Sequence, residues 1–185
     1  KTQYPAACNA AEMLLVHSGQ LAGALPAIAK ALTEAGVTLR ADERARAALY
    51  AAGIASEAAD ESDWGREYLA LTMAVHTVDS IEEAIAFINK HGSHHTDCII
   101  TRDEAAAGKF FALVDSAGVY QNCSTRFADG YRYGFGAEVG HVNVALFAQA
   151  QVTVVKPAWT AEAGLVPCAE AGISTLLRCP CPMLS

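Results

Sequence analysis

Short apolar runs alternate with amphipathic segments from residue 13 to residue 120. The segments repeat apolar residues at spacings of three and four, which is typical of a helix with one buried face, and the runs have the length of buried strands. This pattern predicts strands at residues 37–39, 69–75, 98–100 and 118–120, and helices at residues 21–35, 43–52, 80–91 and 104–114. Residues 13–16 fit either state by pattern alone. Because strand and helix alternate, we expect an α/β fold with a mostly parallel sheet flanked by helices.

Polar residues and glycines mark the ends of several predicted helices. Asp42 precedes a helix, where its carboxylate can accept hydrogen bonds from unpaired backbone N–H groups. Ser80 and Glu83 have the spacing of a capping box. Gly53 and Gly92 follow the last apolar positions of their segments and predict helix ends there.

Composition narrows the functions that the chain can have. Its 185 residues fit one domain, or one domain plus a tail. The net charge of −7 argues against a nucleic-acid partner, because phosphate contacts need clustered lysine and arginine. Apolar runs stay shorter than a bilayer requires, and we expect no membrane partner. The six cysteines lack the spacing of a small secreted scaffold, and we interpret them as reduced thiols of an intracellular protein.

Cys8 is the first candidate for covalent chemistry. It follows Pro5 and two alanines, which leave space around the sulfur. If a helical turn begins at Asn9, its unpaired backbone N–H groups face Cys8 and stabilise a thiolate, the nucleophilic form of cysteine. The alternative is a small buried thiol with no chemical role.

Several stretches of the sequence together carry a family pattern. They are Pro5-Ala6-Ala7-Cys8-Asn9-Ala10, Leu14-Leu15-Val16-His17, Trp64-Gly65-Arg66-Glu67-Tyr68-Leu69, the run from Asp115 through Ser124-Thr125-Arg126-Phe127 to Gly130, and Tyr133-Gly134-Phe135-Gly136-Ala137-Glu138-Val139-Gly140. They resemble gamma-glutamyl phosphate reductase, also called glutamate-5-semialdehyde dehydrogenase, which forms the second half of pyrroline-5-carboxylate synthase. The resemblance covers residues 1–140 and implies the catalytic domain of an enzyme of the aldehyde dehydrogenase superfamily.

The resemblance also implies a reaction, a substrate and a cofactor. The family reduces L-glutamate 5-phosphate to L-glutamate 5-semialdehyde with NADPH and releases phosphate, in proline biosynthesis. In that reaction Cys8 attacks the acyl carbon and holds a thioester, since a thiolate is both a strong nucleophile and a good leaving group. Glu67 falls where aldehyde dehydrogenases place the glutamate that holds the nicotinamide ribose. The alternative for Glu67 is a solvated side chain before a strand.

Residues 121–140 form a long glycine-rich and aromatic segment after a predicted strand, a position that suits a ligand crevice. Two hydroxyls and a guanidinium, from Ser124, Thr125 and Arg126, suit the phosphate or the amino-acid carboxylate of the substrate. Asn122 is a further candidate for orienting a polar group of the substrate. The alternative is a turn that carries a surface arginine.

The remaining cysteines and histidines give little support for a metal site or a thiol-redox pair. His94, His95 and Cys98 match no usual zinc spacing, and we expect no metal. Cys179 and Cys181 are separated by a single residue and have no second pair, so they do not make a zinc or thiol-redox motif.

The sequence departs from the family after Gly140. Residues 169–175 echo residues 137–140 together with the continuation expected there, so we interpret residues 141–185 as a divergent tail, the part that we least expect to fold natively. We expect the cofactor domain upstream of Lys1, because residues 1–185 contain no glycine-rich turn between a strand and a helix that could bind a pyrophosphate. We therefore expect no turnover and no NADPH binding from this chain alone.

The alternatives to a reductase are a non-catalytic remnant or assembly module of the same fold, and another thioester-forming dehydrogenase. The run from Ser124 to Gly130 argues against the second of these. For the full-length protein we expect a homo-oligomer in the cytoplasm, or in a plastid or mitochondrion if a targeting segment precedes this chain.

Overall fold

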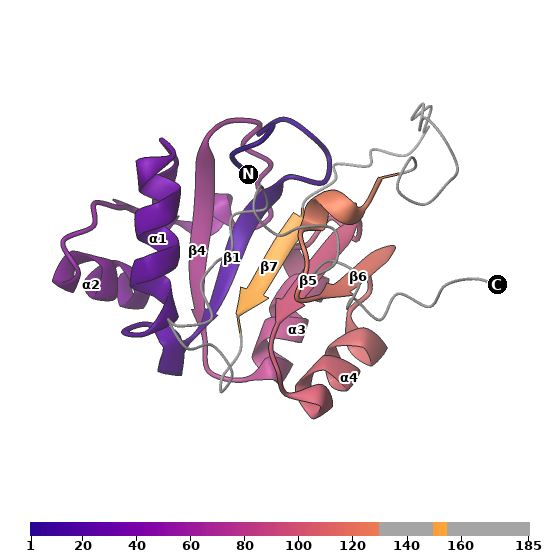
Figure 1. Cartoon of the computed structure of the whole chain (residues 1–185). Coiled ribbons are helices and arrows are strands. Elements are labelled where there is room, and N and C mark those ends of the chain that lie inside the picture. The colour runs from indigo at the N-terminus through magenta and orange to yellow at the C-terminus, as the bar shows by residue number, and fades with distance from the viewer. Residues whose placement is uncertain (130–149, 155–185) are drawn as a thin grey trace.

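The computed structural model describes residues 1–129 and 150–154, and within them the strands form one seven-stranded sheet in which every pair is parallel (Figure 1). The strands are β1 (Ala11–His17), β2 (Thr38–Ala41), β3 (Glu57–Ala58), β4 (Thr72–Val78), β5 (Thr96–Ile100), β6 (Gly118–Gln121) and β7 (Ala150–Val154). The helices are α1 (Ala24–Glu34), α2 (Glu43–Ala51), α3 (Ile81–His91) and α4 (Glu104–Leu113), with the 3-10 turns η1 (Ser18–Gln20), η2 (Glu61–Asp63) and η3 (Thr125–Phe127). The predicted α/β class, a parallel sheet flanked by helices, is confirmed.

The strand order β3-β2-β4-β1-β7-β5-β6 places β1 at the centre of the sheet. Successive side chains of β1 point to opposite faces, as the pleat of a strand requires. Leu14 and Val16 pack in the cluster that includes α1 and α2, whereas Met13 and Leu15 pack in the cluster that includes α3 and α4. The alternation explains why β1 reads as an unbroken apolar run, since both of its faces are buried.

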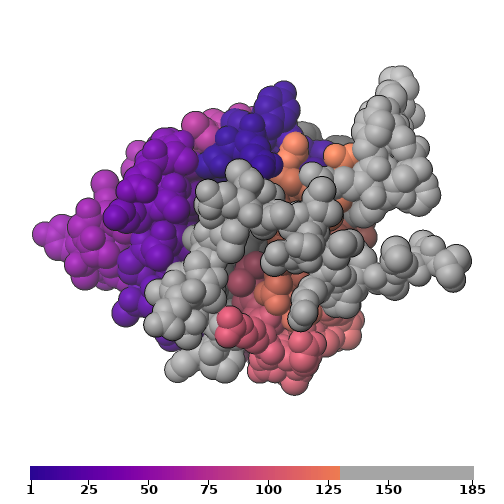
Figure 2. Space-filling model, viewed as in Figure 1, coloured from indigo at the N-terminus to yellow at the C-terminus, as the bar shows by residue number. Residues whose placement is uncertain are grey.

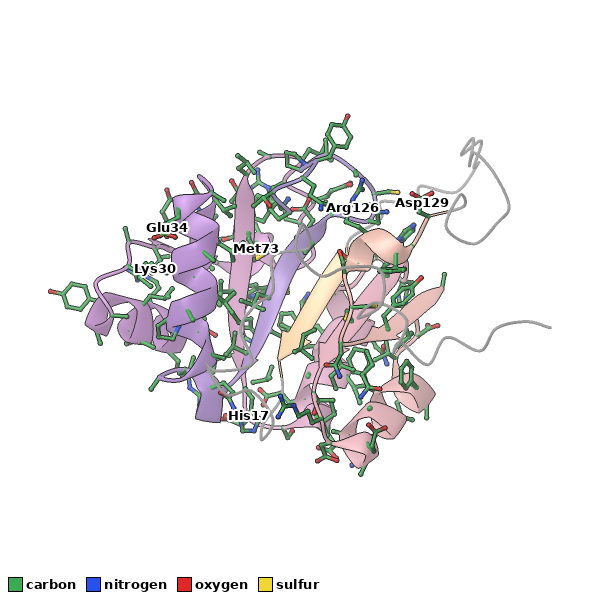
Figure 3. All side chains as sticks on the ribbon, in the orientation of Figure 1. His17, Lys30, Glu34, Met73, Arg126 and Asp129 are labelled. Carbon is green, nitrogen blue, oxygen red and sulfur yellow. The ribbon has the colours of Figure 1, made fainter. Side chains whose placement is uncertain are left out.

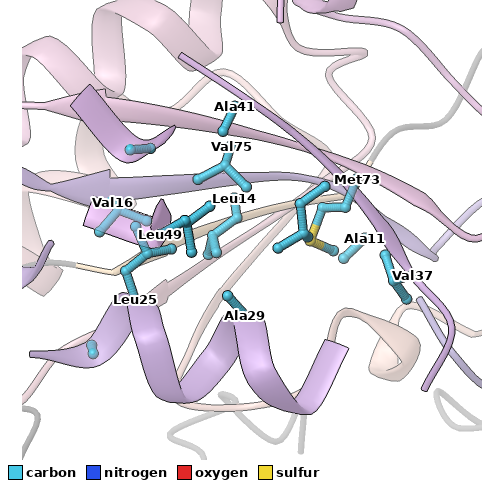
Figure 4. Packing of buried hydrophobic residues seen from close by; sticks show 13 residues of the cluster. Ala11, Leu14, Val16, Leu25, Ala29, Val37, Ala41, Leu49, Met73 and Val75 are labelled. Carbon is cyan, nitrogen blue, oxygen red and sulfur yellow. The ribbon is translucent and has the colours of Figure 1, made fainter. Parts of the chain in front are cut away.

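Helix α1 covers one face of the sheet with the residues that its period places together. Leu25 and Ala29 are completely buried and lie over Leu14 and Val75 of the central strands (Figure 4). The small side chains of Ala24 and Ala29 allow the helix backbone to approach the sheet closely. The high alanine content of the chain therefore belongs partly to its helix–sheet contacts.

Strand β4 begins three residues later than the predicted strand at residues 69–75 and continues to Val78. Leu69 has a left-handed backbone with φ +55°, and the N–H of Thr72 donates to the carbonyl of Ala70, so the extended ladder starts only at Thr72. The polar residue Thr77 belongs to the strand because it pairs with Val16 of β1, and its backbone N–H and hydroxyl both donate to Asp42.

The predicted helix caps are present, one of them in altered form. The Asp42 carboxylate accepts a hydrogen bond from the N–H of Ala45 at the start of α2, as predicted. Ser80 Oγ likewise accepts from the N–H of Glu83 at the start of α3. The Glu83 carboxylate, however, accepts from the N–H of Asp79 and not from that of Ser80, so the reciprocal half of the capping box is displaced by one residue.

Strand β7 comes from the segment that the sequence analysis assigns to the divergent tail. It lies between β1 and β5 and pairs with both (Figure 1). The sheet therefore includes five residues beyond Gly140. The glycine-rich stretch at residues 133–140, the echo at residues 169–175 and the cysteines after residue 154 lie outside the described residues.

Candidate functional site

Cys8 is a free, exposed thiol in a turn that leads directly into β1. The N–H of Ala10 closes the turn by donating to the carbonyl of Ala7 at 2.8 Å. Within this described segment no helix begins at Asn9, so the expectation that helix N–H groups face the Cys8 thiol is wrong. The reason is that Asn9 and Ala10 are buried and continue straight into the extended backbone of the central strand.

Asn9 joins the cysteine turn to η3, which lies far along the chain. Its backbone carbonyl accepts a hydrogen bond from Thr125 Oγ1 at 2.8 Å, and its side-chain Oδ1 accepts from the Arg126 guanidinium. Its Nδ2 donates to the carbonyl of Ala128 at 2.8 Å. Asn9 is only 5% exposed. Arg126 accordingly lies at the end of β1 opposite His17 (Figure 3), which is the amino-terminal edge of the sheet.

The chain reaches this edge by reversing direction after β6. Gln121 is level with the last part of β5, so the strand ends near the carboxyl-terminal edge of the sheet. Asn122 follows in a left-handed conformation with φ +54°. The Cys98 thiol then donates to the carbonyl of Cys123 at 3.1 Å, which shows that the returning segment crosses β5. The crevice predicted at the carboxyl ends of the strands is therefore not where η3 lies.

Asn122 stays at the edge where the reversal occurs. Its Oδ1 accepts from the N–H of Thr101 at 2.9 Å, and its Nδ2 donates to the carbonyl of the same residue at 2.7 Å. Both polar atoms of the amide thus hold the reversal in place. The structure brings Ser124, Thr125 and Arg126 to the cysteine turn, but it leaves Asn122 at the opposite edge.

The hydroxyls of Ser124 and Thr125 both make hydrogen bonds within the protein. Ser124 Oγ accepts from the N–H of Arg126 at 3.2 Å, and the buried Thr125 donates its hydroxyl to Asn9. Arg126 is half-buried and carries five N–H donors, of which the Asn9 contact uses one nitrogen. The guanidinium is therefore the charged group of this run that can bind an anion, and the Ser124 hydroxyl, which only accepts in this bond, can also donate to one.

Glu12, the second residue of β1, makes a buried ion pair beneath the cysteine turn. Lys1 Nζ lies 2.7 Å from Glu12 Oε2, and both side chains are at most 2% exposed. The N–H of Tyr68 also donates to Glu12 Oε2, at 3.3 Å. Burial raises the pKa of Glu12, while Lys1 and the Tyr68 N–H lower it and the negative charge of Glu67 adds to the increase. Glu67, which is half-buried, thus lies near the same edge of the sheet.

Sequence reasoning missed Asn9 and Glu12 as parts of this edge. A signal existed for Glu12, because it interrupts the apolar run that forms β1. For Asn9 the signal was its position directly after Cys8. Figure 2 shows the N-terminal residues in indigo and the residues near 125 in orange meeting at the surface.

The described residues contain no group of three or more histidine, cysteine, aspartate or glutamate side chains arranged to hold a metal ion. Among the helices described here, none combines the length and the apolar character that crossing a membrane requires.

The fold and this edge define a parallel α/β domain in which a cysteine turn and an arginine meet at the start of the central strand. No protein-family model matches the chain. Over 140 residues it is 59% identical to gamma-glutamyl phosphate reductase of Synechococcus elongatus and 57% identical to gamma-glutamyl phosphate reductase 1 of Synechocystis. Both alignments cover 76% of this chain, which spans 31% of the length of each relative.

A solved structure gives the same result. The gamma-glutamyl phosphate reductase of Thermotoga maritima is similar with a TM-score of 0.71 and 43% sequence identity, over 76% of this chain and 33% of that one. The resemblance to gamma-glutamyl phosphate reductase that the sequence predicted is therefore confirmed.

Proposed function

We propose that this chain is part of the catalytic domain of an NADPH-dependent gamma-glutamyl phosphate reductase, which reduces L-glutamate 5-phosphate to L-glutamate 5-semialdehyde in proline biosynthesis. The observation that carries the proposal is the junction of Cys8 and Arg126. An exposed, free cysteine directly precedes a buried asparagine, and that asparagine binds the guanidinium of Arg126. The candidate nucleophile therefore directly precedes the residue that binds Arg126, and the positive charge of Arg126 suits an anionic substrate.

Cys8 supplies the covalent step of the proposed reaction. Its thiolate attacks the acyl carbon of the acyl phosphate, a carbon–sulfur bond forms, and the carbon–oxygen bond to phosphate breaks so that phosphate leaves with the electron pair. Arg126 binds an anionic group of the substrate, either the phosphate or the amino-acid carboxylate, by charge-assisted hydrogen bonds. The sulfur leaves again as a thiolate when the aldehyde is released.

Glu67 is the residue of this chain that fits a nicotinamide cofactor. It is half-buried near the edge at which Cys8 lies, and a carboxylate can accept hydrogen bonds from two ribose hydroxyls. NADPH, when bound, supplies the hydride that reduces the acyl group to the aldehyde. The choice of NADPH over NADH rests on the resemblance alone.

The direct test is a chimera in which residues 1–140 replace the homologous 140 residues of the Synechococcus elongatus relative. We expect the chimera to oxidise NADPH when L-glutamate 5-phosphate is added, and Cys8→Ser to abolish this activity, because serine is a poor nucleophile and an alkoxide a poor leaving group. Mass spectrometry of the quenched chimera without NADPH is expected to show the glutamyl adduct on Cys8.

Cys98→Ser is the matched control, because that thiol is completely buried and donates to the Cys123 carbonyl. It is expected to leave the adduct in place. Substantial turnover by the Cys8→Ser chimera would disprove the covalent mechanism. The homo-oligomeric state and the cytoplasmic location stay predictions for the full-length protein.

A further inference from the structure

Asn9 makes three contacts that link the cysteine turn to η3, and together they determine how its amide group is oriented. Its Oδ1 faces the Arg126 guanidinium, which can only donate, and its Nδ2 faces the Ala128 carbonyl, which can only accept. If the amide rotated by half a turn, its Nδ2 would face the N–H donors of Arg126 and its Oδ1 would face the Ala128 carbonyl. Neither contact would then be a hydrogen bond. The side chain is 95% buried, and the bond from Thr125 Oγ1 to its backbone carbonyl fixes the main chain as well.

Arg126 gains a fixed position from this arrangement. A free arginine side chain loses rotational freedom when it binds an anion, and that loss weakens binding. A guanidinium that is already held by one nitrogen loses less on binding. The remaining N–H groups keep the planar geometry that matches a phosphate or a carboxylate.

The partner of Arg126 is a neutral amide, and this matters for the charge at the site. Two other arginines of the described chain have carboxylate partners: Arg44 pairs with Asp79, and Arg40 pairs with Asp63 and Glu57. Those pairs cancel the positive charge. Asn9 holds Arg126 by a neutral carbonyl oxygen, one residue from Cys8, and so adds no negative charge of its own.

We infer that Asn9 is a positioning residue that holds the Arg126 guanidinium beside the cysteine turn without neutralising it, so that the guanidinium meets the anionic group of the acyl phosphate. The identity of that anion rests on the proposed function. The positioning itself does not, because it predicts a property of the Cys8 thiol that can be measured without turnover.

The test is the charge selectivity of Cys8 alkylation in the full chain of 185 residues. Iodoacetate is an anion and iodoacetamide is neutral, so the ratio of their rates at Cys8 reports the positive potential there, independently of how reactive the thiol is. Peptide mapping by mass spectrometry separates Cys8 from the other cysteines. We expect Asn9→Ala and Arg126→Ala each to lower the iodoacetate-to-iodoacetamide ratio by about three- to tenfold, as the displacement or loss of a nearby cation predicts.

The double variant gives the decisive comparison. If Asn9 acts through Arg126, Asn9→Ala changes the ratio in the wild-type background and causes no further change in the Arg126→Ala background. Asn89→Ala is the matched control, since the Asn89 amide also bridges two groups, the Leu113 carbonyl and the Asp115 N–H, neither of which belongs to the cysteine turn or to η3. It is expected to leave the ratio unchanged.

Two results would overturn the inference: an unchanged ratio in Asn9→Ala, or the same decrease in both backgrounds. If Asn9→Ala does not fold, Arg126→Lys replaces it, because lysine keeps the charge but lacks the planar group that Asn9 holds. A ratio equal to that of the wild type would then show that a held guanidinium is unnecessary, whereas a reduced ratio supports the positioning. Loss of activity in the chimera with these ratios intact would refute the proposed function and not the role of Asn9.

Discussion

Gly65 lies so close to the end of α3 that a Cβ atom on it would be 2.5 Å from the carbonyl oxygen of His91. It also has a left-handed backbone, with φ +81°. The segment before β4 therefore packs directly on backbone atoms, which cannot move aside as the end of a flexible side chain can. Trp64, the neighbouring residue, packs against His76 of β4 with its ring tilted, and the ring centroids are 4.8 Å apart.

We predict that Gly65→Ala lowers the free energy of unfolding by roughly 2–4 kcal/mol, from the left-handed backbone and the steric clash together. Gly53→Ala is the matched control, because Gly53 has φ +72° but no atom within 4 Å of its Cβ position. The control is expected to cost about 1 kcal/mol. Urea unfolding of the two variants measures the difference, and equal losses would show that the contact with His91 adds nothing.

Arg126→Ala is predicted to reduce kcat/KM of the chimera by about 10- to 100-fold, since a lost charge-assisted pair typically costs about 1.5–3 kcal/mol. Arg126→Lys is expected to recover only part of the loss if the pair is bidentate. Steady-state kinetics with L-glutamate 5-phosphate measure both. An unchanged kcat/KM in the alanine variant would favour the alternative, in which Arg126 is a surface arginine of a turn.

Asp97 of β5 is predicted to make stability depend on pH. It is 1% exposed, and its Oδ2 accepts from the Ser116 hydroxyl. Burial raises the pKa of Asp97 from 3.8 to about 7, although the Ser116 bond and the charge of His94 oppose the increase. The folded state therefore binds this proton more tightly than the unfolded state, and the free energy of unfolding falls as the pH rises from about 4 to about 7.

The measurement compares urea unfolding at pH 5 and pH 8. Between these values we expect ionisation of Asp97 to remove roughly 2–3 kcal/mol of stability, and Asp97→Asn to abolish that part of the decrease. Glu34→Gln is the control for the loss of one negative charge, because Glu34 is largely exposed. The same pH dependence in wild type and Asp97→Asn would contradict the prediction.

Asp42 is predicted to have the opposite pH dependence. Burial alone would raise the pKa of Asp42, but His76, whose Nδ1 lies 3.2 Å from Asp42 Oδ2, and hydrogen bonds from Ala45 and Thr77 outweigh it and lower the pKa to about 2. Ionised Asp42 therefore stabilises the fold above about pH 4, and this contribution is lost as the pH falls from 4 towards 2. The carboxylate links the start of α2 to β4, so its removal affects two elements.

Asp42→Ala is expected to cost about 2–4 kcal/mol at pH 7, the sum of a helix cap and the hydrogen bonds to β4. Asp103→Ala is the control, because Asp103 caps α4 through the N–H groups of Ala105 and Ala106 and should cost only about 1 kcal/mol. Acid titration followed by circular dichroism should also show that Asp42→Ala removes part of the stability loss between pH 4 and pH 2. Equal costs for the two variants would show that the bonds to β4 contribute nothing.

The sequence predicts well those features of the fold that depend on residues close together in the chain. The Asp42 cap depends on residues three apart, and the buried strands depend on short apolar runs, so both are visible within a few residues. The start of β4 was misplaced because the left-handed conformation of Leu69 leaves no mark in the hydrophobic pattern. The missing helical turn at Asn9 has a similar cause, since burial of the residues around it overrides their helical tendency.

The candidate site depends on contacts that no local pattern contains. Asn9 and Arg126 are 117 residues apart in sequence, and only the family resemblance placed Cys8 and Arg126 in one site before the structure did. The position of Asn122 could not be predicted at all, because it follows from a chain reversal after β6. Asn122 is only four positions from Arg126 in sequence, yet it lies at the opposite edge of the sheet.

The late position of β7 in the sequence has a consequence for how the protein folds. The units β1 to β4 and β5 to β6 leave the ribosome first, yet both β1 and β5 pair with β7. Until residues 150–154 are synthesised, each of these strands presents one row of unpaired N–H and carbonyl groups. Such open edges can pair with another chain, and closing them requires contacts between residues far apart in sequence, which form slowly. The nascent chain is therefore most prone to aggregate in the interval before β7 emerges.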